Sequence, residues 1–364
     1  MANKNLTNAK KAKNDEFYTQ FDDIQKEINA YIEYNPNVFK GKIILLPCDD
    51  PEWSNFTKFF AQNFERFKIK KLISTSYAVD SKTYKSEYQP TLFETKDKKY
   101  DKKKTRKNGK IFILTKDKNG DKKIDVNDLE WDYLKGDGDF KSDEIKKLRN
   151  EADIIITNPP FSLFREFLAW IMEAEKKFLI IGNISTITTK EVFPFIKNNK
   201  MWLGNGFHAG NAYFATPFYR DYAGGVYDSK TGLVKFRNCC WFTNFDHGRR
   251  HELLRLMTAS NNLKYSKHKE IKGKKEYSKY DNYNAIEVSF TDSIPSDYDG
   301  VMGVPVSFLD KYNPNQFEIL GSDYNVKEGL LPKLIKNGWK GKIDRGYLKG
   351  KRLFTRIFIK HKKK

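Results

Sequence analysis

Short apolar runs alternate with amphipathic segments over the first two thirds of the chain. Residues 42–47, 70–78 and 152–157 each hold a run of apolar or β-branched residues that ends in turn residues, which is typical of buried strands. Residues 55–67 and 162–177 instead repeat their apolar side chains at helical spacing. Strands and helices that alternate at these lengths predict βαβ units, and therefore a parallel sheet covered by helices.

The margins of this pattern are less regular. Residues 15–34 have helical spacing and predict a helix with Asp15 as its N-cap. Residues 237–245 predict a late strand of the same sheet, and residues 249–260 predict a helix after it. After about residue 258 the alternation is lost. We therefore expect a second region there, with a different task.

A polar, lysine-rich insertion at about residues 80–130 interrupts the α/β pattern. Within it, residues 110–129 predict a β-hairpin that turns at Asn119-Gly120. The same stretch resembles a calcium loop, whose ligand positions would fall on Asp117, Asn119, Asp121, Asp125 and Asp128. Lys122 occupies the position at which such a loop needs glycine. We therefore favour the plain hairpin and predict no metal site.

Positive charge is concentrated towards the end of the chain. The formal net charge is +20, and residues 333–364 hold 13 Lys or Arg but a single acid, Asp344. Residues 96–110 and 264–275 are further basic clusters. Solvated surface would give the same composition. However, aromatic residues interleave with the basic tail, which favours a folded surface that binds nucleic acid.

Composition also indicates a cellular compartment. No apolar run approaches the roughly 20 residues that a membrane-spanning helix needs. The first 17 residues contain no apolar core of a signal peptide. The three cysteines, Cys48, Cys239 and Cys240, do not make a disulfide framework. We expect a reduced, cytoplasmic protein with no membrane contact.

Three unusual turns follow predicted strands: residues 45–53 (LLPCDDPEW), 134–140 (LKGDGDF) and 157–161 (TNPPF). Ligands of open α/β sheets bind outside the carboxyl ends of the strands. In the third turn, Pro159 and Pro160 remove two N–H donors and leave carbonyl oxygens to accept hydrogen bonds. Asn158 adds a side-chain acceptor, and Phe161 adds a flat face. The group predicts a site for a planar ring that bears an amino group, although Asn-Pro-Pro could also simply end a strand.

Asn-Pro-Pro-Phe after an apolar strand resembles motif IV of the amino-methyltransferases that use S-adenosylmethionine, in the form associated with adenine N6. NDEFYTQ (14–20), CDDP (48–51), GDGDF (136–140) and TNPPFSLFREF (157–167) also occur in this order. On these four motifs, residues 14 to about 250 are similar to the EcoRI-type adenine-specific DNA methyltransferases.

The resemblance implies a fold and a division of the chain. The expected fold is α/β, with a doubly wound, mostly parallel class I methyltransferase sheet of Rossmann-like type. Residues 1–14 would be a basic flexible arm, residues 15–258 the methyltransferase domain, and residues 259–364 a basic target-recognition region. This motif order resembles the γ arrangement, in which recognition lies C-terminal.

The resemblance also implies roles for single residues. Asn158 and Pro159 would accept the two N6 protons of a flipped adenine, with Pro160 and Phe161 completing the catalytic turn. S-adenosylmethionine would be bound by residues of the four motifs: Phe17, Tyr18, Thr19, Pro47, Cys48, Asp49, Asp50, Asp139, Phe140 and Asn158. The Pro47–Asp50 turn lacks the usual Phe-x-Gly-x-Gly, so its individual contacts do not follow from the family.

The partner implied is duplex DNA, methylated by a monomer that acts with or without a cognate restriction endonuclease and forms no stable complex with it. Methylation of an RNA base or of a protein glutamine also uses Asn-Pro-Pro-aromatic and stays an alternative, as does a DNA-binding relative that has lost activity. Two other features remain open. His247 and His251 stand at i and i+4, as a metal pair would, and residues 204–214 form a Gly-rich loop that could border the target base.

Overall fold

The computed structural model describes residues 17–51, 54–78, 97–208, 210–216 and 225–362. The chain divides into two compact units, Met1–Asn183 with Gly204–Asp246, and Ile184–Leu203 with His247–Lys364. The division that the sequence predicted at residue 258 was one of function, between catalysis and target recognition. The assignment of target recognition to residues 259–364 stays a prediction. No helix in the described ranges is long and apolar enough to cross a membrane.

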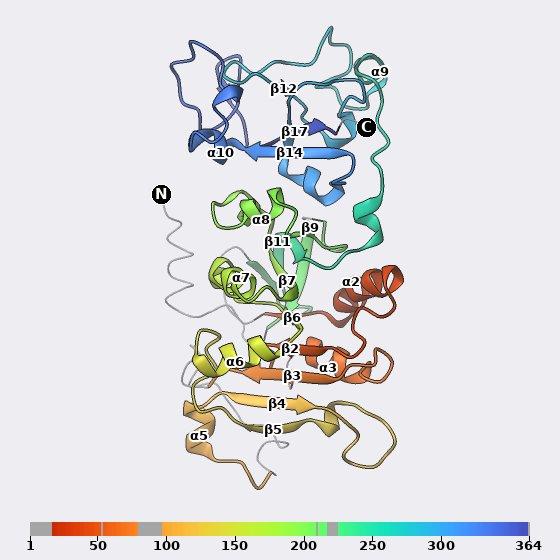
Figure 1. The fold of residues 1–364 in the computed structure, drawn as a ribbon, viewed down its shortest axis with the longest axis vertical. Coiled ribbons are helices and arrows are strands. Elements are labelled where there is room, and N and C mark those ends of the chain that lie inside the picture. The colour runs from red at the N-terminus through yellow and green to blue at the C-terminus, as the bar shows by residue number, and fades with distance from the viewer. Residues whose placement is uncertain (1–16, 52–53, 79–96, 209, 217–224, 363–364) are drawn as a thin grey trace. The chain divides into compact units, whose positions relative to one another are not determined.

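The first unit is built on a large sheet (Figure 1). Its strands follow the order β1-β9-β11-β7-β6-β2-β3-β4-β5, with β10 paired to β11. Their bounds are β1 Tyr18–Thr19, β2 Ile43–Leu46, β3 Lys71–Ser76, β4 Lys110–Leu114, β5 Glu130–Tyr133, β6 Ile154–Thr157, β7 Lys177–Asn183, β9 Gly210–Ala215, β10 Gly225–Asp228 and β11 Leu233–Thr243. The four central strands β7, β6, β2 and β3 are parallel. Antiparallel strands flank them on both sides.

Helices cover both faces of this sheet. Helices α2 (Phe21–Tyr34) and α3 (Asn55–Gln62) lie on one side of it, and α6 (Asp143–Glu151) and α7 (Phe164–Glu173) lie on the other (Figure 1). The apolar faces of α2 and α3 share one buried core with alternate residues of the central strands. The doubly wound class I methyltransferase fold predicted from the sequence is confirmed, and its parallel part is the four central strands.

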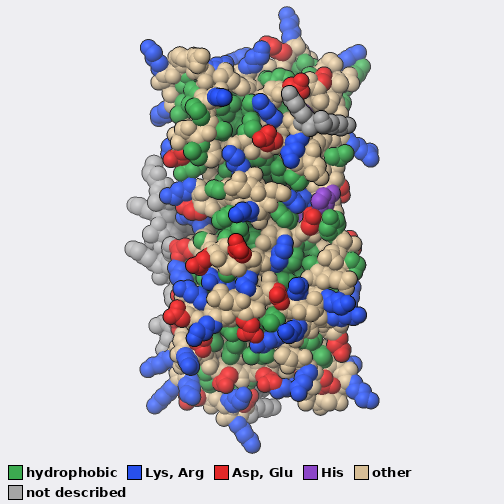
Figure 2. Space-filling view, in the orientation of Figure 1, with side chains coloured by type: hydrophobic (Ala, Val, Ile, Leu, Met, Phe, Trp, Pro, Cys, Tyr) green, Lys and Arg blue, Asp and Glu red, His purple; other side chains and the backbone are tan. Residues whose placement is uncertain are grey.

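The second unit has a smaller sheet of order β12-β13-β17-β14. Its elements are α8 Phe193–Lys197, α9 Ala259–Tyr265, β12 Ile286–Glu287, β13 Met302–Pro305, β14 Phe317–Ser322, α10 Asp323–Lys327 and β17 Arg356–His361, with a hairpin of β15 Tyr347–Leu348 and β16 Lys351–Arg352. A core that includes Tyr280, Tyr283 and Phe358 packs beside the strands. The basic tail is therefore folded. Figure 2 shows Lys and Arg side chains over the whole visible face, mixed with Asp and Glu.

Three local predictions need correction. The first helix begins at Phe21, with Gln20 as N-cap, because Tyr18 and Thr19 pair with β9 as a strand; Asp15 lies outside the described residues. The predicted hairpin exists, but β4 pairs with β5 across the whole of residues 115–129 instead of turning at Asn119-Gly120. The second strand of the hairpin is Glu130–Tyr133, in which exposed and more buried side chains alternate. It lies beyond residue 129, where the predicted hairpin ended.

The third correction concerns residues 249–260, where the structure has no α-helix before Ala259. A single 3₁₀ turn, Gly248–His251, is followed by residues 252–258, which have no regular secondary structure. The side-chain amide of Gln316 bonds both backbone groups of Leu254, at 2.8 and 2.9 Å, and Asn313 Nδ2 donates to the Glu252 carbonyl. These side chains take the place of helical hydrogen bonds, so the helical spacing of leucines was misleading.

Candidate active site

Two of the unusual turns lie side by side at the point where the chain reverses direction across the sheet. From β2 the chain proceeds to β3 on one side, and β6 and β7 follow on the other side of β2. Such a switch point is where open α/β sheets bind ligands. Thr157 Oγ1, at the end of β6, donates to the Pro47 carbonyl at the end of β2, at 2.8 Å. This bond joins the Pro47–Asp50 turn to the Asn158–Phe161 turn.

The amide of Asn158 is fixed in one orientation. Its Nδ2 donates to the Phe17 carbonyl at 2.8 Å, and a flipped amide would place two carbonyl oxygens against each other. Its Oδ1 is buried and has no hydrogen-bond partner among the described residues. An unpaired buried acceptor costs about 1–3 kcal/mol. The site therefore presents an acceptor that is ready for a donor.

The two prolines differ in what their carbonyls do. The Pro160 carbonyl accepts the Leu163 N–H at 2.9 Å, as part of the 3₁₀ turn Phe161–Leu163. Within the described ranges, no donor bonds to the Pro159 carbonyl. Of the two carbonyls freed by the proline pair, only that of Pro159 is open to a ligand.

Phe161 lies in a cluster of aromatic rings. Its ring stacks on Phe17, with centroids 5.8 Å apart and planes at 22°. Phe214 of β9 and Phe236 of β11 meet it edge to face, at 5.8 and 5.1 Å. Phe161 is only partly buried, so it keeps some exposed area. The neighbouring rings hold its orientation.

The N-terminal strand β1 closes the same edge of the sheet. Phe17, Tyr18 and Thr19 are all buried, and Tyr18 and Thr19 pair with β9. Asn55, at the start of α3, donates from Nδ2 to the Thr19 carbonyl at 2.7 Å. Two asparagine amides, Asn158 and Asn55, thus hold this strand. Thr19 Oγ1 is buried with no hydrogen-bond partner among the described residues.

The Pro47–Asp50 turn buries a carboxylate. Cys48 has φ +68°, which turns the chain sharply; Pro47 is buried, and Cys48 and Asp50 are half-buried. Asp49 is 5% exposed, and its Oδ1 accepts from Ser54 Oγ at 2.7 Å. Its Oδ2 is without a partner in the described part of the chain. Burial raises the pKa of Asp49 to about 7, against the neighbouring hydroxyl groups of Thr157 and Ser54, which lower it.

The 136–140 turn lies across the end of β3. Gly138 has φ +88°, and a Cβ there would lie 2.5 Å from the Ser76 carbonyl oxygen, so only glycine fits. Burial, and next the adjacent Cys48 thiol, raise the pKa of Tyr77, and Asp139 contributes in the same direction. Tyr77 therefore links this turn to Cys48.

The two residues predicted to bind the cofactor in this turn differ in exposure. Asp139 is half-buried, and its Oδ1 accepts from the Lys141 N–H at 2.9 Å. Phe140 is 1% exposed and packs edge-on against Phe167 and Trp170 of α7, at 5.1 and 5.7 Å. The structure thus brings all four motifs together, although little of the Phe140 ring is accessible.

Sequence reasoning missed a buried acid beside this site. Glu27 of α2 is fully buried and accepts the backbone N–H groups of Asn205 at 2.9 Å and Gly206 at 2.6 Å, and the Tyr31 hydroxyl. A Cβ at Gly204 would lie 2.2 Å from Glu27 Oε1. These contacts give the Gly-rich loop a structural role. The signal was an acid on the apolar face of α2, next to Ile28.

Neither of the two candidate metal sites is assembled in the part of the chain that the structure describes. In the loop 117–128 the carboxylates accept backbone N–H groups, as Asp128 does from Lys118 and Asn119 at 2.9 and 3.2 Å. His247 is buried, with Nε2 3.0 Å from the Leu203 carbonyl oxygen, whereas His251 is exposed. The described ranges contain no cluster of three or more potential metal ligands from His, Cys, Asp and Glu.

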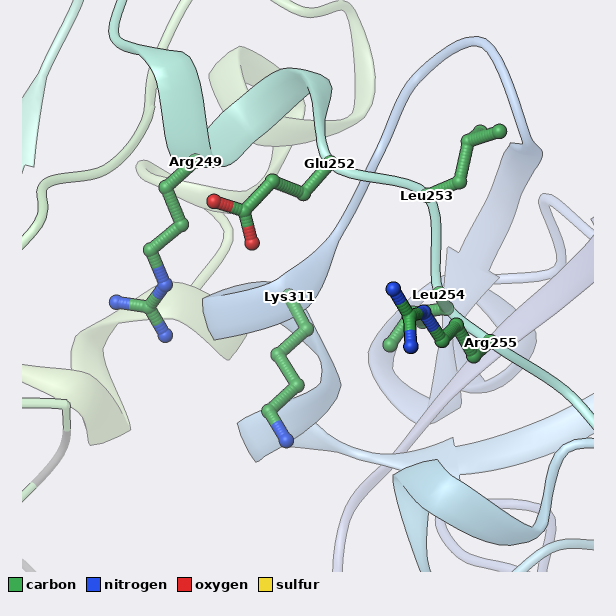
Figure 3. Close-up of a pocket in the computed structure, with 6 residues that line it drawn as sticks. All are labelled: Arg249, Glu252, Leu253, Leu254, Arg255 and Lys311. Atoms are coloured by element: carbon green, nitrogen blue, oxygen red, sulfur yellow. The ribbon is translucent and has the colours of Figure 1, made fainter.

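The second unit holds a basic pocket of about 400 Å³ (Figure 3). It is lined by Arg249, Glu252, Leu253, Leu254, Arg255 and Lys311. Arg249 pairs with Asp310. In Figure 3, Leu253 points away from the Arg249 and Lys311 side chains, which extend from separate elements. The pocket supplies three cationic side chains and one carboxylate, that of Glu252.

Comparison with known proteins places these features in context. The model of one family, described as adenine-specific methyltransferase EcoRI, matches residues 5–362. The chain is 39% identical to the type II methyltransferase M.EcoRI of Escherichia coli, over 96% of this chain and 98% of that protein. It is 32% identical to the type II methyltransferase M.MgeORF184P of Mycoplasma genitalium and 30% identical to M.MpnI of Mycoplasma pneumoniae, each over 97% of both chains. No solved structure matches the chain.

Proposed function

The chain belongs to the adenine-specific methyltransferase EcoRI family, and from this premise we propose that Asn158 and Pro159 hold the adenine amine that it methylates. The protein is a site-specific DNA methyltransferase that acts on adenine. The observation that carries the residue assignment is the fixed amide of Asn158, whose Oδ1 is buried without a partner in the described chain. The open carbonyl of the adjacent Pro159 supplies the second acceptor.

These acceptors suit an exocyclic amine. A hydrogen bond to each N6 proton draws the nitrogen lone pair out of conjugation and leaves it free to attack. Attack of N6 on the methyl group of a bound donor would form an N–C bond as the donor's bond to that methyl group breaks, and the methylated amine would release one of its two protons to solvent. Phe161 stacks on the flipped base, which offsets part of the few kcal/mol that flipping costs. Because these groups are fixed before the reaction, little reorganisation is needed.

Methyltransferases of this kind use S-adenosylmethionine in general, and it would supply an electrophilic methyl group on a positively charged sulfur. The residues present fit it. Buried oxygens of Thr19 and Asp49 have no partner in the described chain, and both lie in motifs predicted to bind it. We assign its binding to Phe17, Tyr18, Thr19, Pro47, Cys48, Asp49, Asp50, Asp139, Phe140 and Asn158. We place the carboxylate of Asp49 beside the positively charged part of S-adenosylmethionine. That charge would favour the ionised form of the carboxylate.

Duplex DNA is the substrate, and we assign its recognition to the basic region 259–364. The names of the relatives suggest a place in a type II restriction-modification system. On this proposal the chain works as a monomer and forms no stable complex with an endonuclease. Sequencing of methylated adenines in DNA from cells that express the chain would define its site, and parallel assays on RNA and protein would reveal another acceptor.

The test of the site is Asn158→Ala. We expect kcat to fall at least 100-fold, because the variant loses an acceptor used as the amine reacts, while cofactor affinity changes less than tenfold. Asn55→Ala is the matched control, since it also removes an amide that holds β1 but leaves the Asn158 acceptor in place. At saturating cofactor, Asn55→Ala should keep kcat within tenfold of the wild type. Equal losses of kcat in both variants would show that the acceptor is not catalytic.

A further inference from the structure

Phe354 in the second unit is exposed to a degree unusual for its size. Its relative exposure is 87%, which no other large apolar side chain in the described ranges reaches. It lies in residues 353–355, between β16 and β17. A phenylalanine that buries so little apolar area contributes almost nothing to the core, so its position calls for another reason.

The backbone that presents this ring is firmly held. Leu353 N–H donates to the Gly346 carbonyl at 2.9 Å. On the other side, Arg356 Nη1 donates to the carbonyls of Phe354 and Thr355 at 3.4 and 3.2 Å. The backbone that carries the ring is therefore held by hydrogen bonds on both sides.

Arg356, which makes two of these hydrogen bonds, is buried together with its ion-pair partner Glu287. Arg356 is 9% exposed and Glu287 is 6% exposed. They form an ion pair of 2.7 Å, and Arg356 Nε adds two further bonds of 3.1 Å to the same carboxylate. The Arg356 N–H also donates to the buried Asp323 at 2.6 Å. Burying an ion pair stabilises a fold little compared with apolar packing, but it fixes geometry. Here the geometry that it fixes is that of the segment carrying Phe354.

The surroundings of Phe354 are cationic. The β15–β16 hairpin just before it exposes Lys349, Lys351 and Arg352, of which Arg352 pairs with Asp344. Trp339 packs on Tyr347 of this hairpin, with centroids 5.9 Å apart, which brings the exposed Lys340 and Lys342 to it. An exposed ring bordered by several lysines matches the two parts of a nucleic acid, its bases and its phosphates.

We propose that Phe354 inserts against the bases of bound duplex DNA as an apolar wedge, while the lysines around it contact phosphates. This inference rests on the proposed assignment of DNA recognition to the region 259–364. A wedge partly unstacks a base step and bends the duplex, and rigid presentation avoids the entropy cost of ordering a loose loop at that moment. Unstacking also assists the flipping that an enzyme acting on a base requires.

The test measures affinity and base unstacking together. Phe354→Ala, Phe354→Tyr and the wild type are titrated with a duplex that contains the methylation site and a 2-aminopurine reporter. We expect Phe354→Ala to bind roughly 10-fold more weakly, because the base loses the ring that it stacks on, and to lose most of the fluorescence rise. Phe354→Tyr keeps the ring and should stay within twofold. Tyr265→Ala is the control, because Tyr265 is an aromatic of the same unit that is 60% exposed beside Lys264.

Each contrary outcome has a distinct meaning. If Phe354→Ala binds and unstacks the duplex as the wild type does, and methylates it normally, the wedge is wrong and the proposed function stands. If the wild type neither binds nor methylates duplex DNA, the proposed function itself fails. If sedimentation shows that the wild type is a dimer and Phe354→Ala is a monomer, a second copy covers the ring and the wedge is again wrong. Thermal unfolding would check that Phe354→Ala is folded. We expect it to be folded, because the Phe354 side chain is exposed.

Discussion

At the scale of single residues, the site is defined by what its polar atoms lack. Asn158 and Thr19 each keep a buried oxygen without a partner in the described chain, and so does Asp49. Buried polar atoms are nearly always paired in folded proteins, so three such atoms in motifs that adjoin one another indicate a ligand. None of these oxygens could be recognised from the sequence. The residue types were predictable from the motifs, but which of their oxygens stay open depends on the bonds that their neighbours make.

Asp49 gives a prediction about pH. Its pKa is raised to about 7, so the folded protein holds a proton that the unfolded chain releases near pH 4. The stability due to this proton is complete below about pH 4 and is lost as pH rises to 7. The wild type, measured without cofactor, should therefore lose roughly 2–3 kcal/mol more than Asp49→Asn in free energy of unfolding between pH 5 and 8. Urea unfolding at the two pH values measures this difference, and equal losses in the two proteins would contradict it.

At the scale of elements, the sheet and its helices could be predicted and the connections could not. Period and length identified the central strands β2, β3 and β6, and their parallel pairing followed from the βαβ rule. The helix predicted over 249–260 failed because Gln316 and Asn313, more than 50 positions away, bond its backbone. The bond from Glu27 to Gly206 spans 179 positions. No local pattern carries such information, since a helix face reports burial but not the partner.

Gly138 gives the prediction at this scale. Gly138→Ala should displace the 136–140 turn, because the new Cβ would lie 2.5 Å from the Ser76 carbonyl at a positive φ. We expect a loss of about 2–3 kcal/mol in stability and a clear fall in S-adenosylmethionine affinity, measured by urea unfolding and calorimetry. Gly136→Ala is the matched control, since a Cβ there meets nothing within 4 Å. If both variants bind the cofactor like the wild type, this turn does not shape its site.

At the scale of the whole molecule, net charge is the property that could be predicted most directly from the sequence. The chain carries a net +20. The basic tail is not a loose arm, because β17 and the hairpin before it belong to a folded unit. What composition could not supply was which cations remain available. Arg249 is engaged by Asp310 and Arg352 by Asp344, so the number of basic residues overstates the number of phosphate contacts.

The corresponding prediction is a steep dependence of DNA affinity on salt. The logarithm of the association constant should fall linearly with the logarithm of salt concentration, with a slope near 0.9 for each phosphate neutralised. The double variant Arg255→Gln, Lys311→Gln, which changes two cations of the basic pocket, should reduce that slope by about 1–2 and leave cofactor affinity unchanged. Fluorescence anisotropy at several salt concentrations measures the slope. An unchanged slope would place the bound DNA away from this pocket.

The bond from Asn158 to the Phe17 carbonyl, between residues 141 positions apart, makes the amide that we propose to be catalytic depend on a segment far from it in the sequence. A ribosome completes the Asn-Pro-Pro-Phe turn long after it has released residues 17–19, yet the amide is oriented only once that early strand has docked. A change that displaces either segment would therefore break the hydrogen bond that orients this amide. The residue just before a short edge strand therefore sets the direction in which the Asn158 acceptor points.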